Sequence, residues 1–175
     1  MAVYGKALGN GYGITAVIGK QNIMEAAQST FISSTFWTER IGPCAALASL
    51  NVMEREESWK QITNRGSIIM ERWKMLAKKF NLKINITGIP AIAAFGFESS
   101  NRLAYKTLIT QEMLKRGYLA SNLVFSSLSH TPDVIDGYFN ELDPVFGMIK
   151  QCEEGVDVMS LLDGPVCQTG FKRLN

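Results

Sequence analysis

The sequence predicts an α/β chain in two parts: the end of a large parallel-sheet domain over residues 1–56, and a small α+β domain over residues 57–175. Two observations lead to this prediction. The chain opens on short apolar stretches around a glycine-rich turn, whereas from residue 57 onward amphipathic helices with a period of 3.6 alternate with strands of period 2. Helices on one face of a small sheet are typical of an α+β layer.

The first part opens with two short strands that flank the glycine-rich turn. Its predicted elements are a strand at 1–4, a strand at 14–19, a short helix at 20–28, a Ser/Thr-rich and aromatic loop at 29–38 and a helix at 44–53. Pro43 suits the first turn of this last helix, where its missing amide is tolerated. These elements leave a core incomplete, so we expect the earlier strands of a larger sheet to lie before residue 1.

A long amphipathic helix opens the second part. Its apolar face repeats at steps of three and four and comprises Trp59, Ile62, Gly66, Ile69, Trp73, Leu76 and Phe80. Alternation then predicts a strand at 84–87, an interruption at 88–90 and a strand at 92–97. The second of these strands directs Ala93, Phe95 and Phe97 to one side, which is therefore the predicted buried face.

Two helices and a strand complete the second part. They are predicted as a helix at 101–116 capped by Asn101, a strand at 119–128 and a helix that starts at Thr131 with Pro132 in its first turn. The buried face of the last helix comprises Ile135, Tyr138, Leu142, Val145, Ile149 and Cys152. We expect Pro144 to kink or shorten this helix, because proline removes an amide donor and crowds the preceding turn.

Composition argues against several classes of function. Charged residues make up 19% of the chain, below the roughly 25% usual in soluble domains, which indicates that part of the surface is covered by a partner or another domain. The net charge is +2 and the lysines form no groove with aromatics, so nucleic-acid binding has little support. No apolar run reaches the length needed to span a bilayer, so we expect no membrane association.

The cysteines and the single histidine restrict the chemistry further. Cys44, Cys152 and Cys167 are widely spaced and odd in number, which predicts neither a disulfide framework nor a zinc site and favours the cytoplasm. His130, the only histidine, falls at a predicted helix start, so we interpret it as a helix-start residue rather than a catalyst. We therefore predict no metal centre and no catalysis by a Ser–His–Asp triad.

Lys6 is the strongest candidate for chemistry. It stands between an apolar strand end and a glycine-dense turn, a setting in which an amine can attack a carbonyl and form a Schiff base. The glycines allow the backbone to pass close to a flat ligand. For a lysine near glycines taken by itself, a solvated side chain beside a hairpin turn is the more usual explanation. A nucleotide-binding loop is a weaker reading, because no G-K-S/T follows the glycines.

The motifs together resemble the class III aminotransferases, and within them the proteins similar to glutamate-1-semialdehyde aminomutase. The resemblance rests on the stretch from Gly5 to Tyr12, on Ser34-Thr35-Phe36, on Ser129-His130-Thr131 and on the tail from Leu161 to Cys167. It implies a fold-type I pyridoxal-phosphate enzyme, of which this chain is the carboxyl-terminal portion. The large domain then ends near residue 56 and the small domain follows.

The resemblance also implies roles for two residues. Lys6 matches the lysine that forms the internal aldimine with pyridoxal 5'-phosphate and then carries protons during transfer of the amino group. Thr35 matches the threonine that hydrogen-bonds the cofactor phosphate of the opposite protomer. The implied partners are therefore a small-molecule amino donor and acceptor and a second copy of the chain, in a homodimer with shared cofactor sites. An ordinary loop hydroxyl is the other reading of Thr35.

The chain departs from the family pattern in two places. Asn10, Gly13 and Thr15 stand where the family usually has a glycine, a proline and a further glycine. After Thr35, a long and bulky link replaces the usual compact G-N-P. The substrate is left open between glutamate-1-semialdehyde, another amino acid and an amino or keto sugar. Arg173 is a candidate contact for a substrate carboxylate, although a tail arginine is more often solvated.

Two hypotheses for the function follow. In the first, the chain is part of an aminotransferase or aminomutase that works through Lys6, and this stretch alone has no appreciable activity, because the other groups around the cofactor lie before residue 1. In the second, it is a non-catalytic dimerisation or interaction module derived from the family, and Lys6 is vestigial.

Overall fold

The computed structural model describes residues 1–170, so Arg173 lies outside the described residues. The chain divides into two compact units, Met1–Trp59 and Lys60–Asn175. We refer to them as unit 1 and unit 2.

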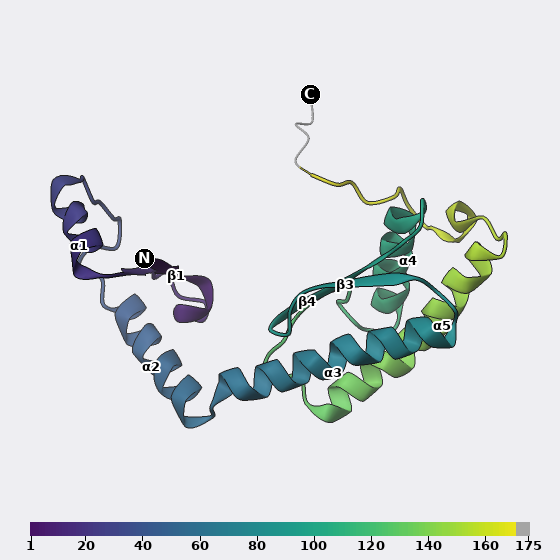
Figure 1. Ribbon diagram of the computed structural model, residues 1–175, viewed down its shortest axis with the longest axis horizontal. Helices are drawn as coiled ribbons and strands as arrows, with labels where there is room; N and C mark the ends of the chain where they lie inside the picture. The colour runs from purple at the N-terminus through teal and green to yellow at the C-terminus, as the bar shows by residue number, and fades with distance from the viewer. Residues whose placement is uncertain (171–175) are drawn as a thin grey trace. The chain divides into compact units, whose positions relative to one another are not determined.

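Unit 1 contains one small sheet and short helices. Its elements are β1 (Ala2–Tyr4), η1 (Lys6–Leu8), β2 (Ala16–Ile18), α1 (Gln21–Met24), η2 (Glu25–Ser29) and α2 (Ile41–Arg55) (Figure 1). The two strands pair antiparallel, with Ala2 opposite Ile18 and Tyr4 opposite Ala16. The sheet that we expect to be largely parallel is thus represented here by one antiparallel pair, because the glycine-rich turn returns the chain alongside itself.

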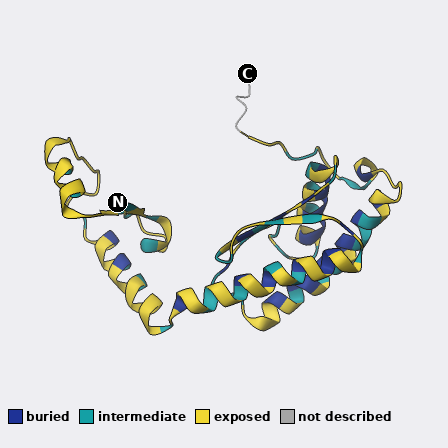
Figure 2. Ribbon diagram, viewed as in Figure 1, coloured by how far each residue is buried: buried dark blue, intermediate teal, exposed yellow. Residues whose placement is uncertain are grey.

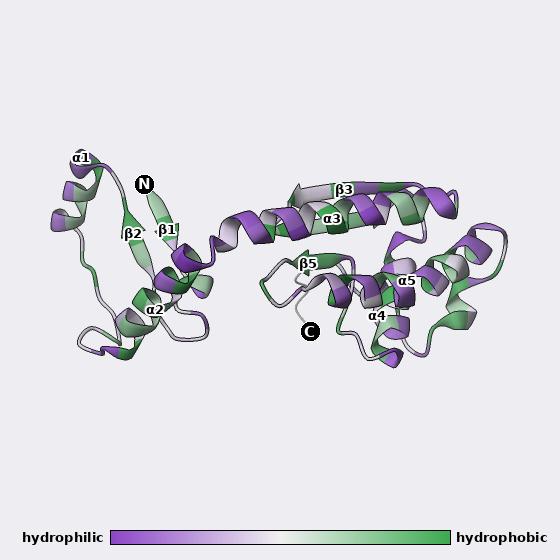
Figure 3. Cartoon of the chain, turned by 90° about the horizontal axis from the view of Figure 1, so that it is seen from below, coloured by the Kyte–Doolittle hydropathy of each residue, from purple (hydrophilic) through white to green (hydrophobic). Residues whose placement is uncertain are grey.

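Unit 1 buries almost none of its apolar side chains (Figure 2). Val17 and Ile18 of β2 are 48% and 54% exposed, and Leu47 of α2 is 63% exposed. The strands and much of α2 are nevertheless hydrophobic in sequence (Figure 3). An apolar surface of this extent is typical of a region that another surface covers, in agreement with the low charge content.

Unit 2 has a three-stranded sheet and long helices. Its elements are the body of α3 (Ser58–Lys79), β3 (Ile84–Ile89), β4 (Ile92–Phe97), α4 (Arg102–Lys115), β5 (Leu123–Phe125), α5 (Pro132–Glu153) and η3 (Val158–Leu161). The sheet order is β3-β4-β5, and both pairs are antiparallel. The predicted types and order of the long elements are confirmed.

The core of unit 2 lies between the sheet and its helices. Phe95 of β4 meets Trp73 of α3 with 4.7 Å between ring centroids and Phe146 of α5 with 5.9 Å. Phe97 meets Tyr105 of α4 at 5.5 Å. Trp73 is fully buried, and its indole N–H donates to the Tyr138 hydroxyl at 3.0 Å. Three helices therefore pack on the face of β4 that the sequence predicts as buried.

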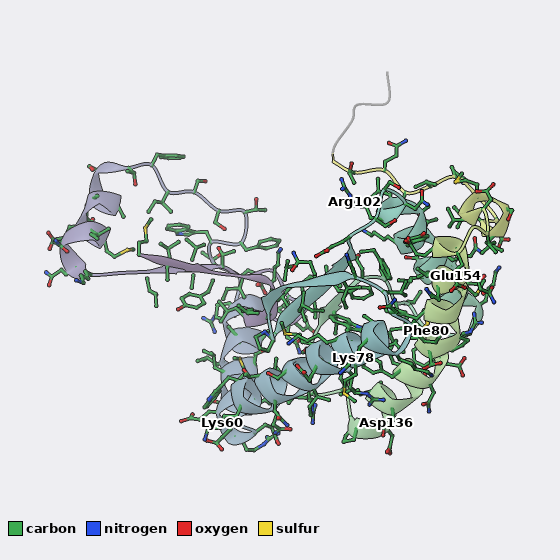
Figure 4. All side chains as sticks on the ribbon, turned by 45° about the vertical axis from the view of Figure 1, so that its right-hand side comes forward. Lys60, Lys78, Phe80, Arg102, Asp136 and Glu154 are labelled. Atoms are coloured by element: carbon green, nitrogen blue, oxygen red, sulfur yellow. The ribbon has the colours of Figure 1, made fainter. Side chains whose placement is uncertain are left out.

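Ion pairs and ring contacts fasten α3 to α5 at the rim of this core. Arg72 pairs with Asp136, which is labelled on α5 in Figure 4, and the Arg72 guanidinium lies 4.3 Å from the centroid of Phe139. Further along the same two helices, Lys79 of α3 pairs with Asp143 of α5. Such exposed pairs add little stability individually but fix how the two helices face each other.

Two strand predictions about unit 2 are corrected. The strand expected at 119–128 is regular only at Leu123–Phe125, which pairs with residues 92–94 of β4. Just before β5, the Asn122 carbonyl accepts from the Phe95 amide at 3.0 Å, and the Asn122 side chain, in place of a backbone amide, donates to the Phe95 carbonyl at 2.7 Å. The strand expected to end at residue 87 continues through Gly88 to Ile89, because Gly88 adopts a φ of +84° without strain.

Of the two effects expected of Pro144, a kink or a shortening of the last helix, the shortening does not occur. α5 runs unbroken from Pro132 to Glu153 with Pro144 inside it. Leu142, Val145 and Phe146 on either side of the proline are fully buried, and their packing outweighs a penalty of about 3 kcal/mol. Trp59, which we assigned to the buried face of α3, is 49% exposed.

The carboxyl-terminal segment from Leu161 to Cys167 lies along α4 as a strap. The Gln111 side chain donates to the Leu161 carbonyl at 2.9 Å and accepts from the Asp163 amide at 2.7 Å. Thr107 accepts from the Cys167 amide at 2.9 Å, one helical turn earlier. Polar side chains of α4 at positions i and i+4 therefore bind the backbone of the strap.

Glu112 is the charged group at the centre of this polar face. Arg116 and Lys115 donate to its two carboxylate oxygens at 2.8 and 2.9 Å. Burial raises the pKa of Glu112, but the hydrogen bonds from Arg116, Gln111 and Lys115 outweigh burial and lower this pKa to about 2.

Removing the Tyr138 hydroxyl should destabilise unit 2. Tyr138→Phe leaves the Trp73 N–H buried without an acceptor, so the free energy of unfolding should fall by about 1–3 kcal/mol in urea titrations. Tyr118→Phe is the matched control, because the Tyr118 hydroxyl forms no hydrogen bond within the described part of the chain. Equal losses for the two variants would contradict this account of the core.

Glu112 should make the free energy of unfolding depend on pH in the acid range. Because its folded pKa of about 2 lies below the usual 4.5, Glu112 stabilises the fold above pH 4.5, and this contribution disappears as the pH falls toward 2. Glu112→Gln should cost about 2–3 kcal/mol at pH 7 and flatten the fall in stability below pH 4.5. Glu98→Gln, at an exposed carboxylate, is the control in the same pH series, and an unchanged slope in Glu112→Gln would refute the assignment.

Candidate functional site

Lys6 opens the short helix η1 directly after β1, with a backbone φ of +50°. The Lys6 carbonyl accepts from the amides of Gly9 and Asn10, both at 3.2 Å. Left-handed backbone is uncommon for a residue other than glycine and costs roughly 1 kcal/mol or more. Such a conformation is found preferentially at functional positions, so the backbone adds a second reason to single out Lys6.

Gly9 makes the turn after Lys6 possible. A Cβ at Gly9 would lie 2.1 Å from the Tyr12 carbonyl oxygen and 2.8 Å from the Ile14 side chain. No side chain fits there. Asn10 continues this tight turn at a φ of +46°. The turn therefore requires a glycine at position 9, and this requirement is visible only in the structure.

The Lys6 side chain is exposed, and its amine is not engaged by other groups of the described chain. Within the described residues, no carboxylate or carbonyl forms an ion pair or hydrogen bond with its amine. An amine without a fixed partner can react with an aldehyde and exchange a proton.

Thr35 lies in the exposed loop between η2 and α2. Its hydroxyl likewise forms no hydrogen bond within the described residues. Its neighbours are held, because the Phe36 amide donates to the Ser34 hydroxyl and the Glu39 amide donates to the Phe36 carbonyl, both at 3.2 Å. Within the described residues the Thr35 hydroxyl is therefore without a hydrogen-bond partner beside an ordered turn, as are the hydroxyls of Ser33 and Thr38 in the same loop.

A cavity of about 550 Å³ lies beside this loop in unit 1. Residues 13–15 line it from the glycine-rich turn, and Ser34, Phe36 and Trp37 line it from the loop. Neither Lys6 nor Thr35 is among the lining residues, so unit 1 does not gather the two candidates around one cavity. Sequence reasoning missed Glu39, which also lines the cavity and caps α2 with its carboxylate.

His130 lies in unit 2 at the start of α5. Its Nδ1 accepts from the Ser127 amide at 3.0 Å, and the adjacent Thr131 caps the helix by accepting from the Val134 amide at 3.4 Å. The ring is thus held within a turn, in agreement with the interpretation of His130 as a helix-start residue. Within residues 1–170, no cluster of acidic, His or Cys side chains could hold a metal ion, and no helix is long and apolar enough to cross a membrane.

Comparison with known proteins identifies relatives that match much of the chain. The family model for class-III aminotransferases matches residues 1–133. The 3-aminobutyryl-CoA aminotransferase of Cloacimonas acidaminovorans is 29% identical over 112 residues, which cover 63% of this chain and 27% of that protein. A glutamate-1-semialdehyde 2,1-aminomutase of Methanococcus maripaludis is 24% identical over 160 residues, which cover 82% and 37%.

A solved structure has the same fold. The FumI protein of Sphingopyxis sp. MTA144, in its PLP internal aldimine form, aligns with 91% of this chain and 39% of its own at a TM-score of 0.77 and 20% identity. This likeness confirms the predicted fold class, part of a fold-type I transferase. The chain spans less than two-fifths of the length of each of these three relatives.

Replacing Gly9 should loosen the turn that holds Lys6. Gly9→Ala forces a contact of 2.1 Å on the Tyr12 carbonyl, a clash that costs about 1–3 kcal/mol. Hydrogen exchange of the Asn10 and Tyr12 amides should therefore accelerate by about five- to a hundredfold. Gly13→Ala is the control in the same segment, because its Cβ would lie at an ordinary 3.6 Å from Phe36. Equal exchange in the two variants would show that the turn does not need Gly9.

Proposed function

The chain belongs to the class III aminotransferases, and from this premise we propose that it is the carboxyl-terminal part of a pyridoxal-phosphate aminotransferase or aminomutase that works through Lys6. The observation that carries the proposal is the free amine of a lysine in left-handed backbone, at the start of a turn that admits only glycine at position 9. The relatives are much longer than this chain, which supports the proposal that the chain is one part of such an enzyme.

The residues present fit pyridoxal 5'-phosphate by the chemistry of their donors. A primary amine suits the cofactor's aldehyde, and a free loop hydroxyl suits a phosphate oxygen. The absence of a Cβ at Gly9 lets the backbone turn tightly beside Lys6. When bound, the cofactor supplies an electron-withdrawing ring that makes the α-proton of an amino substrate acidic.

Each residue then has a defined task. Lys6 Nζ would hold the cofactor through its aldehyde and would take and return the proton of the substrate. No ion pair in the described chain has to be broken to free this amine. Thr35 donates its hydroxyl hydrogen to the phosphate, and by the family resemblance this phosphate belongs to the partner protomer.

The proposal includes a cytoplasmic homodimer that acts on a small-molecule amino donor and acceptor. The exposed apolar surface of unit 1 supports an assembly in which further protein covers it. The substrate stays open, since the relatives named above act on different molecules and Phe36 and Trp37 make this loop bulkier than the family pattern.

A non-catalytic interaction module is the second candidate. The observation that favours it is the separate core of unit 2, around Trp73 and Phe95, to which Lys6 does not contribute. This candidate predicts that replacement of Lys6 leaves every property of the protein unchanged.

Labelling of Lys6 separates the two candidates. The purified full-length protein is incubated with pyridoxal phosphate and reduced with borohydride, and the modified peptide is identified by mass spectrometry. We expect one label, on Lys6, and a fall in amino transfer of about 100- to 10,000-fold in Lys6→Ala, as for loss of a general acid–base group.

Lys20→Ala is the matched control, because Lys20 is also an exposed lysine of unit 1. It should keep both the label on Lys6 and the activity. A label spread over several lysines, or an active Lys6→Ala variant, would remove Lys6 from the mechanism.

A further inference from the structure

The helix α2 begins with an unusual cap. Arg40 occupies the N-cap position with helical backbone, at φ −103° and ψ −14°, and its side chain forms no capping hydrogen bond. Glu39, one residue earlier, takes over this task. Its Oε1 accepts from the Ile41 amide at 2.6 Å and its Oε2 accepts from the Gly42 amide at 3.2 Å. A carboxylate at this end also complements the helix dipole.

This cap uses every free amide of the first turn. The third residue, Pro43, has no amide hydrogen, and the next amide, that of Cys44, already donates to the Arg40 carbonyl at 3.1 Å. A helix N-terminus is often a phosphate site because its free amides point at the ligand. Here Glu39 occupies those amides, so phosphate recognition in this stretch falls to the loop that precedes α2.

Glu39 also fixes that loop. Its own amide donates to the Phe36 carbonyl at 3.2 Å, which closes a turn over residues 36–39. Thr35 directly precedes this turn. The side chain of Glu39 thus holds the helix while its backbone holds the turn, and the position of the Thr35 hydroxyl depends on both.

The start of α2 is in turn packed on the glycine-rich segment. Gly42 is buried, and a Cβ there would lie 2.8 Å from the Gly13 carbonyl oxygen and 3.3 Å from Ile14. The Phe36 ring lies 3.6 Å from the Cβ position of Gly13. These contacts, all within unit 1, pack the turn that precedes α2 against the glycine-rich segment. Loss of the Glu39 cap would therefore change the position of Thr35.

We propose that Glu39 is a positioning residue for cofactor phosphate binding: by capping α2 and closing the turn at 36–39, it holds the Thr35 hydroxyl where it meets the phosphate. The proposal rests on the proposed function, because it acts through Thr35. In a homodimer with shared sites, Glu39 of one protomer sets the phosphate affinity of its partner.

The test compares pyridoxal phosphate with pyridoxal, which lacks the phosphate. In the full-length protein, Glu39→Gln keeps the shape of the side chain but removes its charge and one acceptor oxygen. We expect the Kd for pyridoxal phosphate to rise by about two- to thirtyfold, the range produced by loss of a helix cap, and the Kd for pyridoxal to stay unchanged. Glu25→Gln, at an exposed residue of unit 1 whose carboxylate caps no helix, is the control.

A double-mutant cycle shows whether Glu39 acts through Thr35. In the Thr35→Ala background, Glu39→Gln should have no further effect on the Kd for pyridoxal phosphate, whereas independent roles would make the two changes multiply. Glu39→Asp, which keeps the charge on a shorter side chain, should fall between the wild type and Glu39→Gln and serves if Glu39→Gln folds poorly.

Three results would overturn the proposal. Equal weakening of pyridoxal phosphate and pyridoxal would mean that Glu39 supports the fold only. A loss in Thr35→Ala without a loss in Glu39→Gln would reject Glu39 and leave the proposed function standing. No loss in Thr35→Ala would reject the phosphate role of Thr35, and the role of Glu39 with it, while the labelling of Lys6 tests the rest of the proposed function separately.

Discussion

Burial of Trp73 is the interaction on which unit 2 depends. The indole contacts the Phe95 ring of β4 and donates its hydrogen to Tyr138 of α5, so one side chain joins the first helix, the central strand and the last helix. Burial of a large aromatic ring contributes more than any single surface pair in this unit, and the N–H must find its acceptor once water is excluded. The spacing of the apolar residues on α3 and α5 follows from this requirement.

Unit 1 is organised by a different constraint, which is local and steric. A glycine at position 9 and another at position 42 mark the places where two stretches of backbone come too close for any side chain. Large apolar residues such as Phe31, which is 94% exposed, contribute nothing to a core. The candidate site is therefore held by backbone geometry and helix capping, and the apolar surface around it is exposed.

Sequence periodicity predicted the long elements well, because burial selects apolar residues every three or four positions along α3 and α5. It predicted the ends of β5 and the effect of Pro144 badly, because strand length depends on the partner strand and a helix break depends on the packing around it. For the site, resemblance to a family pointed to Lys6 and Thr35. The capping role of Glu39 and the left-handed backbone of Lys6 have no sequence signature and emerge only from coordinates.

The strap along α4 has a consequence for the order of folding. Its hydrogen bonds join residues far apart in sequence: 52 positions separate Asp163 from Gln111, and 60 separate Cys167 from Thr107. Contacts of such long range form only after the intervening chain has been ordered. Because α4 precedes the strap in the chain, its polar face meets water first, and Gln111 and Thr107 exchange bound water for backbone partners once the strap docks on α4.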